Sequence, residues 1–272
     1  MNLRSHDMIK VGAISVLKDD KGPGGQMDTE TFLDLACETG MDIVDISMDK
    51  GFTGTTPAGL ARIKRKCVKY GLPVGLVSGS GGLVGTDEER RARTDKAKNA
   101  VAVARFLGAP KITVQGGGYR TESYWKPQVD AFKEICDYAA EQGIIIAIHG
   151  HGPPTTPTAE QMLNLYKDVD RENTTLVVDT HKWEGYKEGP LQEHYYGWFE
   201  ALAPLATSVR AKIYKIDSGR EEWCDYPRIL SVLRKNSFNG ALSIYYMGSG
   251  RNQANEREGM AKGVKYLKTL VS

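Results

Sequence analysis

The chain has 272 residues, of which 40% are hydrophobic and 26% charged, and its formal net charge at pH 7 is +2. This length and composition are ordinary for a globular protein, and so small a charge excess predicts neither a nucleic acid nor a membrane surface as a partner. No stretch approaches the roughly 18 apolar residues of a membrane helix, and the first ten residues lack the apolar core of a signal peptide, so a cytoplasmic protein is expected.

Eight short runs of apolar and β-branched residues recur along the chain. Such runs are typical of strands that are buried on both faces, as in a parallel sheet. They begin at Ile9, Met41, Leu72, Lys111, Ile144, Thr174, Ser208 and Ala241.

Amphipathic helical patterns fill the intervals between these runs. Asp28 and Thr56 stand where N-caps are expected, and Pro57 occupies a first helical position. The basic clusters in ARIKRKCVKY and DEERRARTDKAK are expected on solvated helix faces. Glycines follow four helical patterns just before the next strand, as left-handed C-terminal caps do; they are Gly40, Gly71, Gly108 and Gly143.

The eightfold alternation predicts that residues 1–272 form one domain, a (β/α)8 TIM barrel of the α/β class. An open, doubly wound sheet is the alternative. It usually has fewer strands at this length, and no GxGxxG follows the first run.

The cysteines are widely spaced and include no CxxC pair. This pattern predicts reduced, buried thiols, not a disulfide framework or a cysteine-ligated zinc site. The four residues are Cys37, Cys67, Cys136 and Cys224.

Active sites of TIM barrels lie on the loops that follow the C-terminal ends of the strands. His149 and His151 end the fifth run and share one face if the strand is still extended there, and Asp179 and His181 end the sixth run in the same way. Because neighbouring strands lie about 4.8 Å apart, His149, Asp179 and His181 could together hold Zn²⁺, Mn²⁺ or Fe²⁺. Alternatively, some of these side chains only bond to loop backbone.

Two further residues could take part in acid–base chemistry beside His149. Lys215 shares a strand face with Val209, Ala211 and Ile213, and would be an acid, a base or an oxyanion partner if that face points into the barrel. If the face points outward, Lys215 lies in solvent. Tyr245 ends the eighth run and is either a proton donor or a packed aromatic residue.

Three polar residues at other strand ends could bind substrate. Asp45 could orient a substrate hydroxyl or cap the following turn. Gln115 precedes three glycines, whose backbone can approach a ligand closely. Arg251 follows the last run, where barrels often bind phosphate or carboxylate, so it is a possible anion anchor or a surface arginine.

Several longer stretches carry a resemblance to a known family. They are TPAGLARIKRKCVKYGLPVGLVSG, ARFLGAPKITVQGG, AAEQGIIIAIHGHG, LVVDTHKW and GALSIYYMG. Over nearly its whole length the chain resembles the sugar phosphate isomerase/epimerase superfamily, the xylose isomerase-like TIM barrels. Its members include ketose epimerases, hydroxypyruvate isomerases, inosose dehydratases and lyases. Relatives often pair through their barrels, so the resemblance implies a homodimer or a homotetramer.

The resemblance also implies a ligand set from which this sequence departs. Such enzymes hold Mn²⁺ or a similar ion with a Glu, an Asp, a His and a second Glu on strands five to eight, and the two Glu residues move the proton. The first Glu position falls on His149, and the Asp is kept as Asp179. The His position falls near Ile213, and the last Glu position on Tyr245.

Two further positions match substrate-binding residues of the family. The histidine that often follows the first Glu is kept as His151, and the substrate-binding histidine after the Asp falls at Lys182. With three anionic ligands reduced to one, the site favours Zn²⁺ or Fe²⁺ over Mg²⁺ if it holds a metal.

These observations predict an enzyme of carbohydrate metabolism, similar to sugar isomerases and epimerases. It would remove a proton next to a carbonyl group of a sugar or a hydroxy-carbonyl compound, with His149 as the base and Lys215 or Tyr245 as the acid. One alternative is a lyase or dehydratase that acts on a keto sugar through the same His, Lys and Tyr residues. The other is a non-catalytic barrel that binds a sugar or a partner and has lost its metal.

Overall fold

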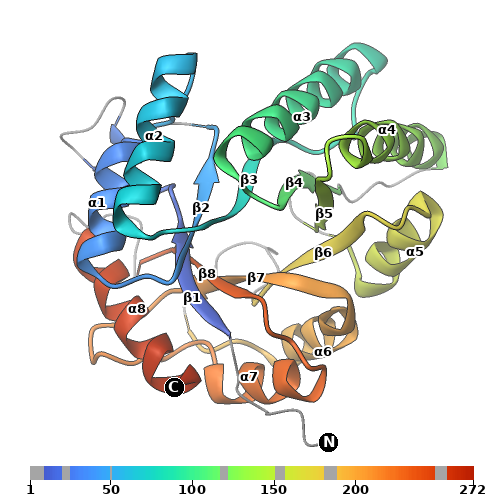
Figure 1. The fold of residues 1–272 in the computed structure, drawn as a ribbon. Helices are drawn as coiled ribbons and strands as arrows, with labels where there is room; N and C mark the ends of the chain where they lie inside the picture. The colour runs from blue at the N-terminus through green and yellow to red at the C-terminus, as the bar shows by residue number, and fades with distance from the viewer. Residues whose placement is uncertain are drawn as a thin grey trace, which may run out of the picture.

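The computed structural model describes residues 9–19, 25–49, 51–116, 122–150, 157–180, 189–248 and 256–272 (Figure 1). In this part of the chain, strands and helices alternate eight times. The strands are β1 (Lys10–Ile14), β2 (Ile43–Ser47), β3 (Val74–Ser80), β4 (Lys111–Gln115), β5 (Ile145–His149), β6 (Thr174–Asp179), β7 (Ala206–Ile213) and β8 (Ala241–Tyr246). The helices are α1 (Thr29–Glu38), α2 (Pro57–Tyr70), α3 (Asp87–Leu107), α4 (Glu122–Ala140), α5 (Ala159–Val169), α6 (Glu193–Leu202), the 3-10 turn η2 (Ala203–Leu205), α7 (Tyr226–Lys235) and α8 (Glu256–Val271).

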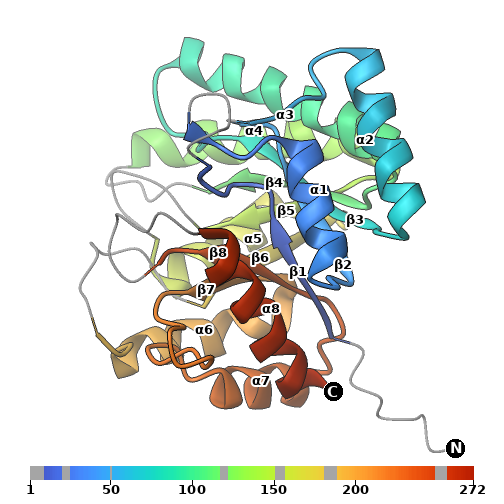
Figure 2. The same ribbon diagram turned by 90° about the vertical axis from the view of Figure 1, so that its left-hand side faces the viewer.

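The strands form one closed ring. Each strand pairs in parallel with its neighbour along the chain, and β8 pairs with β1. Figure 2 shows the barrel from the side, with α8 packed along β1 and β8 where the ring closes. The predicted (β/α)8 barrel is confirmed.

The predicted helix ends are confirmed by their geometry. The Thr31 backbone N–H donates to Asp28 Oδ1 over 3.0 Å, and the Gly59 N–H donates to Thr56 Oγ1 over 3.1 Å. Gly71 and Gly108 end α2 and α3 with φ of 65° and 83°, the left-handed conformation that favours glycine. These local signals explain where α1 and α2 begin and why α2 and α3 stop just before the next strand.

The two faces of the barrel strands have different surroundings. Outward side chains such as Val209 and Ile213 belong to the main apolar core between strands and helices. Leu76, Ala147 and Val177 form a second apolar group, separate from that core, and come from inward positions. Towards the C-terminal ends of the strands, the inward positions are polar or charged.

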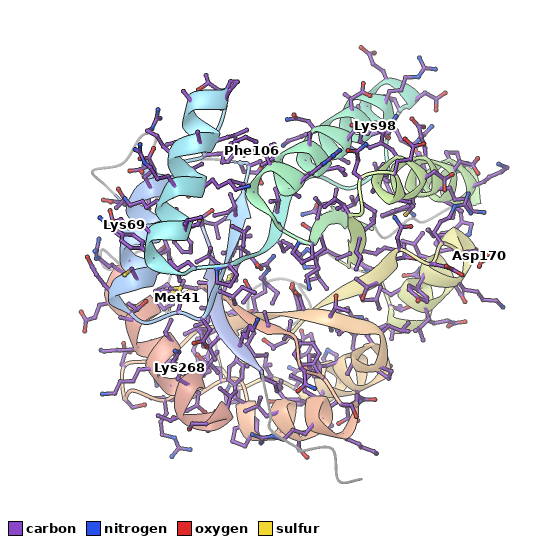
Figure 3. The ribbon with its side chains drawn as sticks, viewed as in Figure 1. Met41, Lys69, Lys98, Phe106, Asp170 and Lys268 are labelled. Carbon is purple, nitrogen blue, oxygen red and sulfur yellow. The ribbon has the colours of Figure 1, made fainter. Side chains whose placement is uncertain are left out.

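Most basic side chains of the two predicted clusters are exposed on α2 and α3, as predicted. Figure 3 shows Lys98 on α3 and Lys268 on α8. Their Nζ atoms lie 2.7 Å from Glu134 Oε1 and 2.8 Å from Asp42 Oδ1. Carboxylates therefore neutralise these basic residues locally. None of the helices in the described part of the chain is long and apolar enough to cross a membrane.

The four cysteines are free thiols. Cys67, Cys136 and Cys224 are buried as predicted, but Cys37 is exposed. The prediction was wrong for Cys37 because this position lies on the solvent face of α1, next to its C-terminal end.

Candidate active site

Four side chains from consecutive strands meet inside the C-terminal end of the barrel: His149 of β5, Asp179 of β6, Lys212 of β7 and Tyr245 of β8. His149 Nε2 lies 2.8 Å from Asp179 Oδ1, and Lys212 Nζ lies 3.3 Å from Asp179 Oδ2. Lys212 Nζ also lies 4.2 Å from the centroid of the Tyr245 ring. We call these four residues the β5–β8 cluster.

The backbone of Lys212 is held on both sides. Its N–H donates to Thr180 Oγ1 over 3.0 Å, and its carbonyl oxygen accepts from the Tyr226 hydroxyl over 2.7 Å. In the sheet, Lys212 pairs directly with Tyr245. These bonds fix the position from which the lysine side chain extends toward Asp179.

A second charged group lies one layer deeper in the barrel. Arg210 precedes Lys212 by two residues on the same strand face, and its Nη1 donates to Asp45 Oδ2 over 3.0 Å and to Ser243 Oγ over 2.8 Å. Both Arg210 and Asp45 are buried. The structure thus places Asp45, a predicted substrate-binding residue, in an ion pair beneath the β5–β8 cluster.

Burial dominates the electrostatics of the cluster. It lowers the pKa of Lys212, and the positive charge of Arg210 acts in the same direction, while the Asp179 carboxylate opposes the shift. Burial raises the pKa of the Tyr245 hydroxyl, which Arg210 partly offsets. Tyr245 therefore stays protonated at neutral pH and can donate a hydrogen bond.

The segment after β7 is organised around one carboxylate. Glu221 Oε2 accepts from the backbone N–H of Tyr214 over 2.7 Å and of Lys215 over 3.2 Å. Its Oε1 accepts from Trp223 over 2.9 Å and from Cys224 over 3.3 Å. Burial raises the pKa of Glu221 to about 7, although these four donors lower it. This carboxyl group fixes the backbone that follows Lys212.

Of the two orientations left open for Lys215, the structure shows the outward one. β7 ends at Ile213, and the face that carries Val209, Ala211 and Ile213 packs against the helices, not into the barrel. The Lys215 side chain is 41% exposed, and its Nζ lies 2.7 Å from Glu222 Oε2. The structure does not bring Lys215 to the β5–β8 cluster, and Lys212 occupies the position expected for it.

The remaining predicted residues lie beside the cluster or outside the described part of the chain. Gln115 is half-buried at the end of β4 and pairs in register with His149 of β5. Outside the described residues lie His151, His181, Lys182 and Arg251.

Sequence reasoning missed Arg210 and Lys212. The signal was present in SVRAKI, where charged residues alternate with apolar ones. The helix-facing side of a barrel strand must be apolar, so the charged residues of such a strand face the interior, where carboxylates can pair with them. The partners, Asp45 and Asp179, come from other strands.

The described part of the predicted metal site does not fit a divalent ion. Both Asp179 oxygens lie within reach of nitrogen atoms, from His149 on one side and Lys212 on the other. A lysine ammonium repels a second cation at the same carboxylate. No group of three His, Cys, Asp or Glu side chains within the described residues is placed to hold a metal.

Comparisons with known proteins agree with this architecture. No curated protein matches the sequence. D-allulose 3-epimerase from Methylomonas sp. has a similar fold, with a TM-score of 0.74 and 17% sequence identity over 96% of this chain and 97% of that chain. 3-keto-D-glucoside 4-epimerase from E. coli has a TM-score of 0.72 and 14% identity over 94% of this chain and 99% of that chain. A xylose isomerase-like TIM barrel protein from Mycobacterium smegmatis in complex with magnesium has a TM-score of 0.67 and 14% identity over 99% of this chain and 100% of that chain. At these identities the likeness shows the fold.

The sequence itself identifies the family. Residues 33–270, most of the chain, match the family profile described as Xylose isomerase-like TIM barrel. The closed ring of eight strands is the architecture which that name describes. The protein therefore belongs to the xylose isomerase-like TIM barrel family.

Proposed function

We propose that this protein is an enzyme that removes a proton from the carbon beside a carbonyl group of a sugar or a related hydroxy-carbonyl compound, as an isomerase or epimerase. The observation that carries the proposal is the buried chain of contacts His149–Asp179–Lys212 at the C-terminal end of the barrel. Active sites of TIM barrels lie at this end. Sugar epimerases among the proteins of similar fold support the substrate class.

His149 is the proposed base. When its Nε2 carries a proton, that N–H donates to Asp179 Oδ1, and Nδ1 then offers the lone pair that accepts the substrate proton. The carboxylate orients the ring and stabilises the imidazolium that forms. His149 is buried, so the proton transfer would occur away from bulk water.

Lys212 and Tyr245 are the proposed donors to the carbonyl oxygen. As the proton leaves carbon, the bonding electrons move to the carbonyl oxygen, and a hydrogen bond from either residue stabilises the resulting enolate. Delivery of a proton from Lys212 or Tyr245 to the opposite face of the same carbon gives the epimer, after which His149 loses, and the donor regains, one proton by exchange with solvent. Return to the former carbonyl carbon, with a proton shift between the two oxygens, gives the isomer. If a leaving group sits β to the carbonyl, the same enolate expels it, which is the lyase reaction.

Isotope exchange tests the proposal. Wild-type protein is incubated with a panel of keto sugars in D₂O, and loss of the proton signal beside the carbonyl is followed by NMR. We expect exchange that His149→Asn reduces by at least about 100-fold, in line with the contribution of a general base. Lys126→Met is the control, because Lys126 is 81% exposed on α4 and its loss should leave exchange unchanged. Absence of exchange and of turnover across the panel would favour a binding protein.

A further inference from the structure

We infer that Lys212 is a built-in cation, whose ammonium occupies the place beside Asp179 that a divalent metal would need, and that the site stabilises its enolate with this fixed charge. That Lys212 takes the place of a metal follows from the geometry. That its charge stabilises an enolate rests in addition on the proposed function.

Both oxygens of the Asp179 carboxylate already face nitrogen atoms. A divalent ion in a protein binds carboxylate oxygens directly, at roughly 2.0–2.2 Å for zinc. Asp179 Oδ2 instead faces Lys212 Nζ at 3.3 Å, and Asp179 Oδ1 faces His149 Nε2 at 2.8 Å. A metal on Oδ2 would displace the Lys212 ammonium from its carboxylate, and a metal on Oδ1 would displace His149 Nε2 and lie close to the same ammonium.

Lys212 is enclosed by the groups around it. Its side chain is 7% exposed, with Asp179 on one side and the face of the Tyr245 ring 4.2 Å away. An aromatic face attracts a cation through its quadrupole. Thr180 and Tyr226 fix the backbone from which the lysine side chain extends, and the ammonium itself would leave the site only by giving up Asp179 and the Tyr245 ring.

Among the described residues, each carboxylate of the barrel interior is already paired with a cation: Asp45 with Arg210, and Asp179 with Lys212. Lys111 adds a further positive charge at the N-terminal end, where its Nζ donates to the Thr207 carbonyl oxygen over 2.9 Å. A divalent ion would add two more positive charges to these three cations and two carboxylates.

This arrangement has a consequence for the chemistry. A fixed ammonium beside a carboxylate and an aromatic face costs no reorganisation when negative charge appears on a nearby oxygen. Lys212 would donate to the former carbonyl oxygen while Asp179 keeps its bond to His149. The ligand expected at this site is a hydroxy-carbonyl compound that becomes an enolate, with no metal between it and the protein.

Metal binding is the direct test. We expect purified wild-type protein to carry substoichiometric metal by mass spectrometry and to show no saturable binding of Mn²⁺ by calorimetry. Lys212→Glu places a carboxylate beside Asp179 and His149 and should create saturable Mn²⁺ binding, which a second change, Asp179→Asn, should abolish. Lys212→Met removes the charge without adding a ligand and is the matched control.

Two results would overturn the inference. One is stoichiometric metal on the wild type that Asp179→Asn removes. The other is equal Mn²⁺ affinity for wild type and Lys212→Glu. Circular dichroism and thermal melting report whether each variant folds, and if Lys212→Glu does not fold, the metal content of wild type and of Asp179→Asn still decides.

An activity measurement separates the two halves of the inference. If wild type catalyses isotope exchange, the rate should survive EDTA, fall at least about 100-fold in Lys212→Met, and recover in part in Lys212→Arg. Loss of exchange in EDTA that Mn²⁺ restores would refute the fixed-cation role. If wild type shows no exchange with any sugar, the proposed function fails, while the metal titrations still test whether Lys212 replaces a metal.

Discussion

Removing one member of the buried Asp45–Arg210 pair should destabilise the fold far more than removing both members. Asp45 and Arg210 are 1% and 3% exposed, and Arg210 Nη1 lies 3.0 Å from Asp45 Oδ2. Asp45→Leu leaves a guanidinium with no counter-ion, and Arg210→Met leaves a carboxylate with none. A buried charge that has lost its partner lowers the stability of the fold by about 3–5 kcal/mol, whereas replacement of both charges by apolar groups of similar volume is often neutral or stabilising.

Thermal melting and urea unfolding measure the difference. With an unfolding entropy of about 2.1 cal/mol/K per residue, the 272-residue chain loses about 5–9 °C of Tm for 3–5 kcal/mol. Each single variant should show a drop of this size, and the double variant should melt within a few degrees of wild type. Lys126→Met, which breaks an exposed pair with Asp130, is the control and should cost at most about 1 kcal/mol.

The double-variant cycle can refute this reasoning. If the double variant loses as much stability as the two single variants added together, Asp45 and Arg210 do not depend on each other. The barrel interior would then tolerate unpaired charges, and the balance of charges there would no longer oppose the binding of a metal.

Three further predictions concern separate parts of the molecule. Burial raises the pKa of Glu221 to about 7, above the roughly 4.3 of an unfolded chain, so the native state binds more protons between these two pH values. The free energy of unfolding should therefore fall as pH rises through this window, by at most about 1.4 kcal/mol per pH unit. Urea unfolding at several pH values should show a shallower dependence of stability on pH for Glu221→Gln. Lys215→Met should change stability by less than about 1 kcal/mol, since its ion pair with Glu222 is partly exposed to solvent. Lys212→Met should cost several kcal/mol, because it removes the buried cation that pairs with the Asp179 carboxylate; melting of the two variants side by side compares them. Gly108→Ala should lower the stability of the fold by about 1–2 kcal/mol, because φ at this position is 83°. Gly197→Ala should raise it by about 0.5–1 kcal/mol, because Gly197 lies inside α6 with open space around its Cβ position. Equal shifts in Tm for the two variants would contradict both expectations.

The fold could be predicted from the sequence because its signals are local. Asp28 and Thr56 cap the helices that follow them, and Gly71 and Gly108 end theirs, within a few residues of the chain. Eight such units leave few ways to bury every strand on both faces, and a closed parallel barrel is one of them. No long-range contact had to be known in advance.

The candidate site could be predicted only in part, because its contacts cross between strands. His149 and Asp179 end neighbouring strands, so their meeting follows from the order of the strands. The alternation of SVRAKI indicates which residues of β7 face inward, but not which carboxylates they meet. Counting back from Lys215 assumed that the alternation continued beyond Ile213, where the strand ends.

The pairing of Asp45 with Arg210 shows what sequence periodicity cannot provide. β2 and β7 are separated by β1 and β8 in the ring, so only closure of the barrel brings these two strands to opposite sides of one interior. The guanidinium reaches across that interior to Asp45 and at the same time donates to Ser243 on the neighbouring β8. Each buried carboxylate of the interior needs a cation, and β7 supplies both cations from two positions on one face. Carboxylates on other strands therefore favour the orientation of β7 in which Arg210 and Lys212 face inward. Pairing with Asp45 turns Arg210 toward the interior, and the same orientation places the Lys212 ammonium beside Asp179.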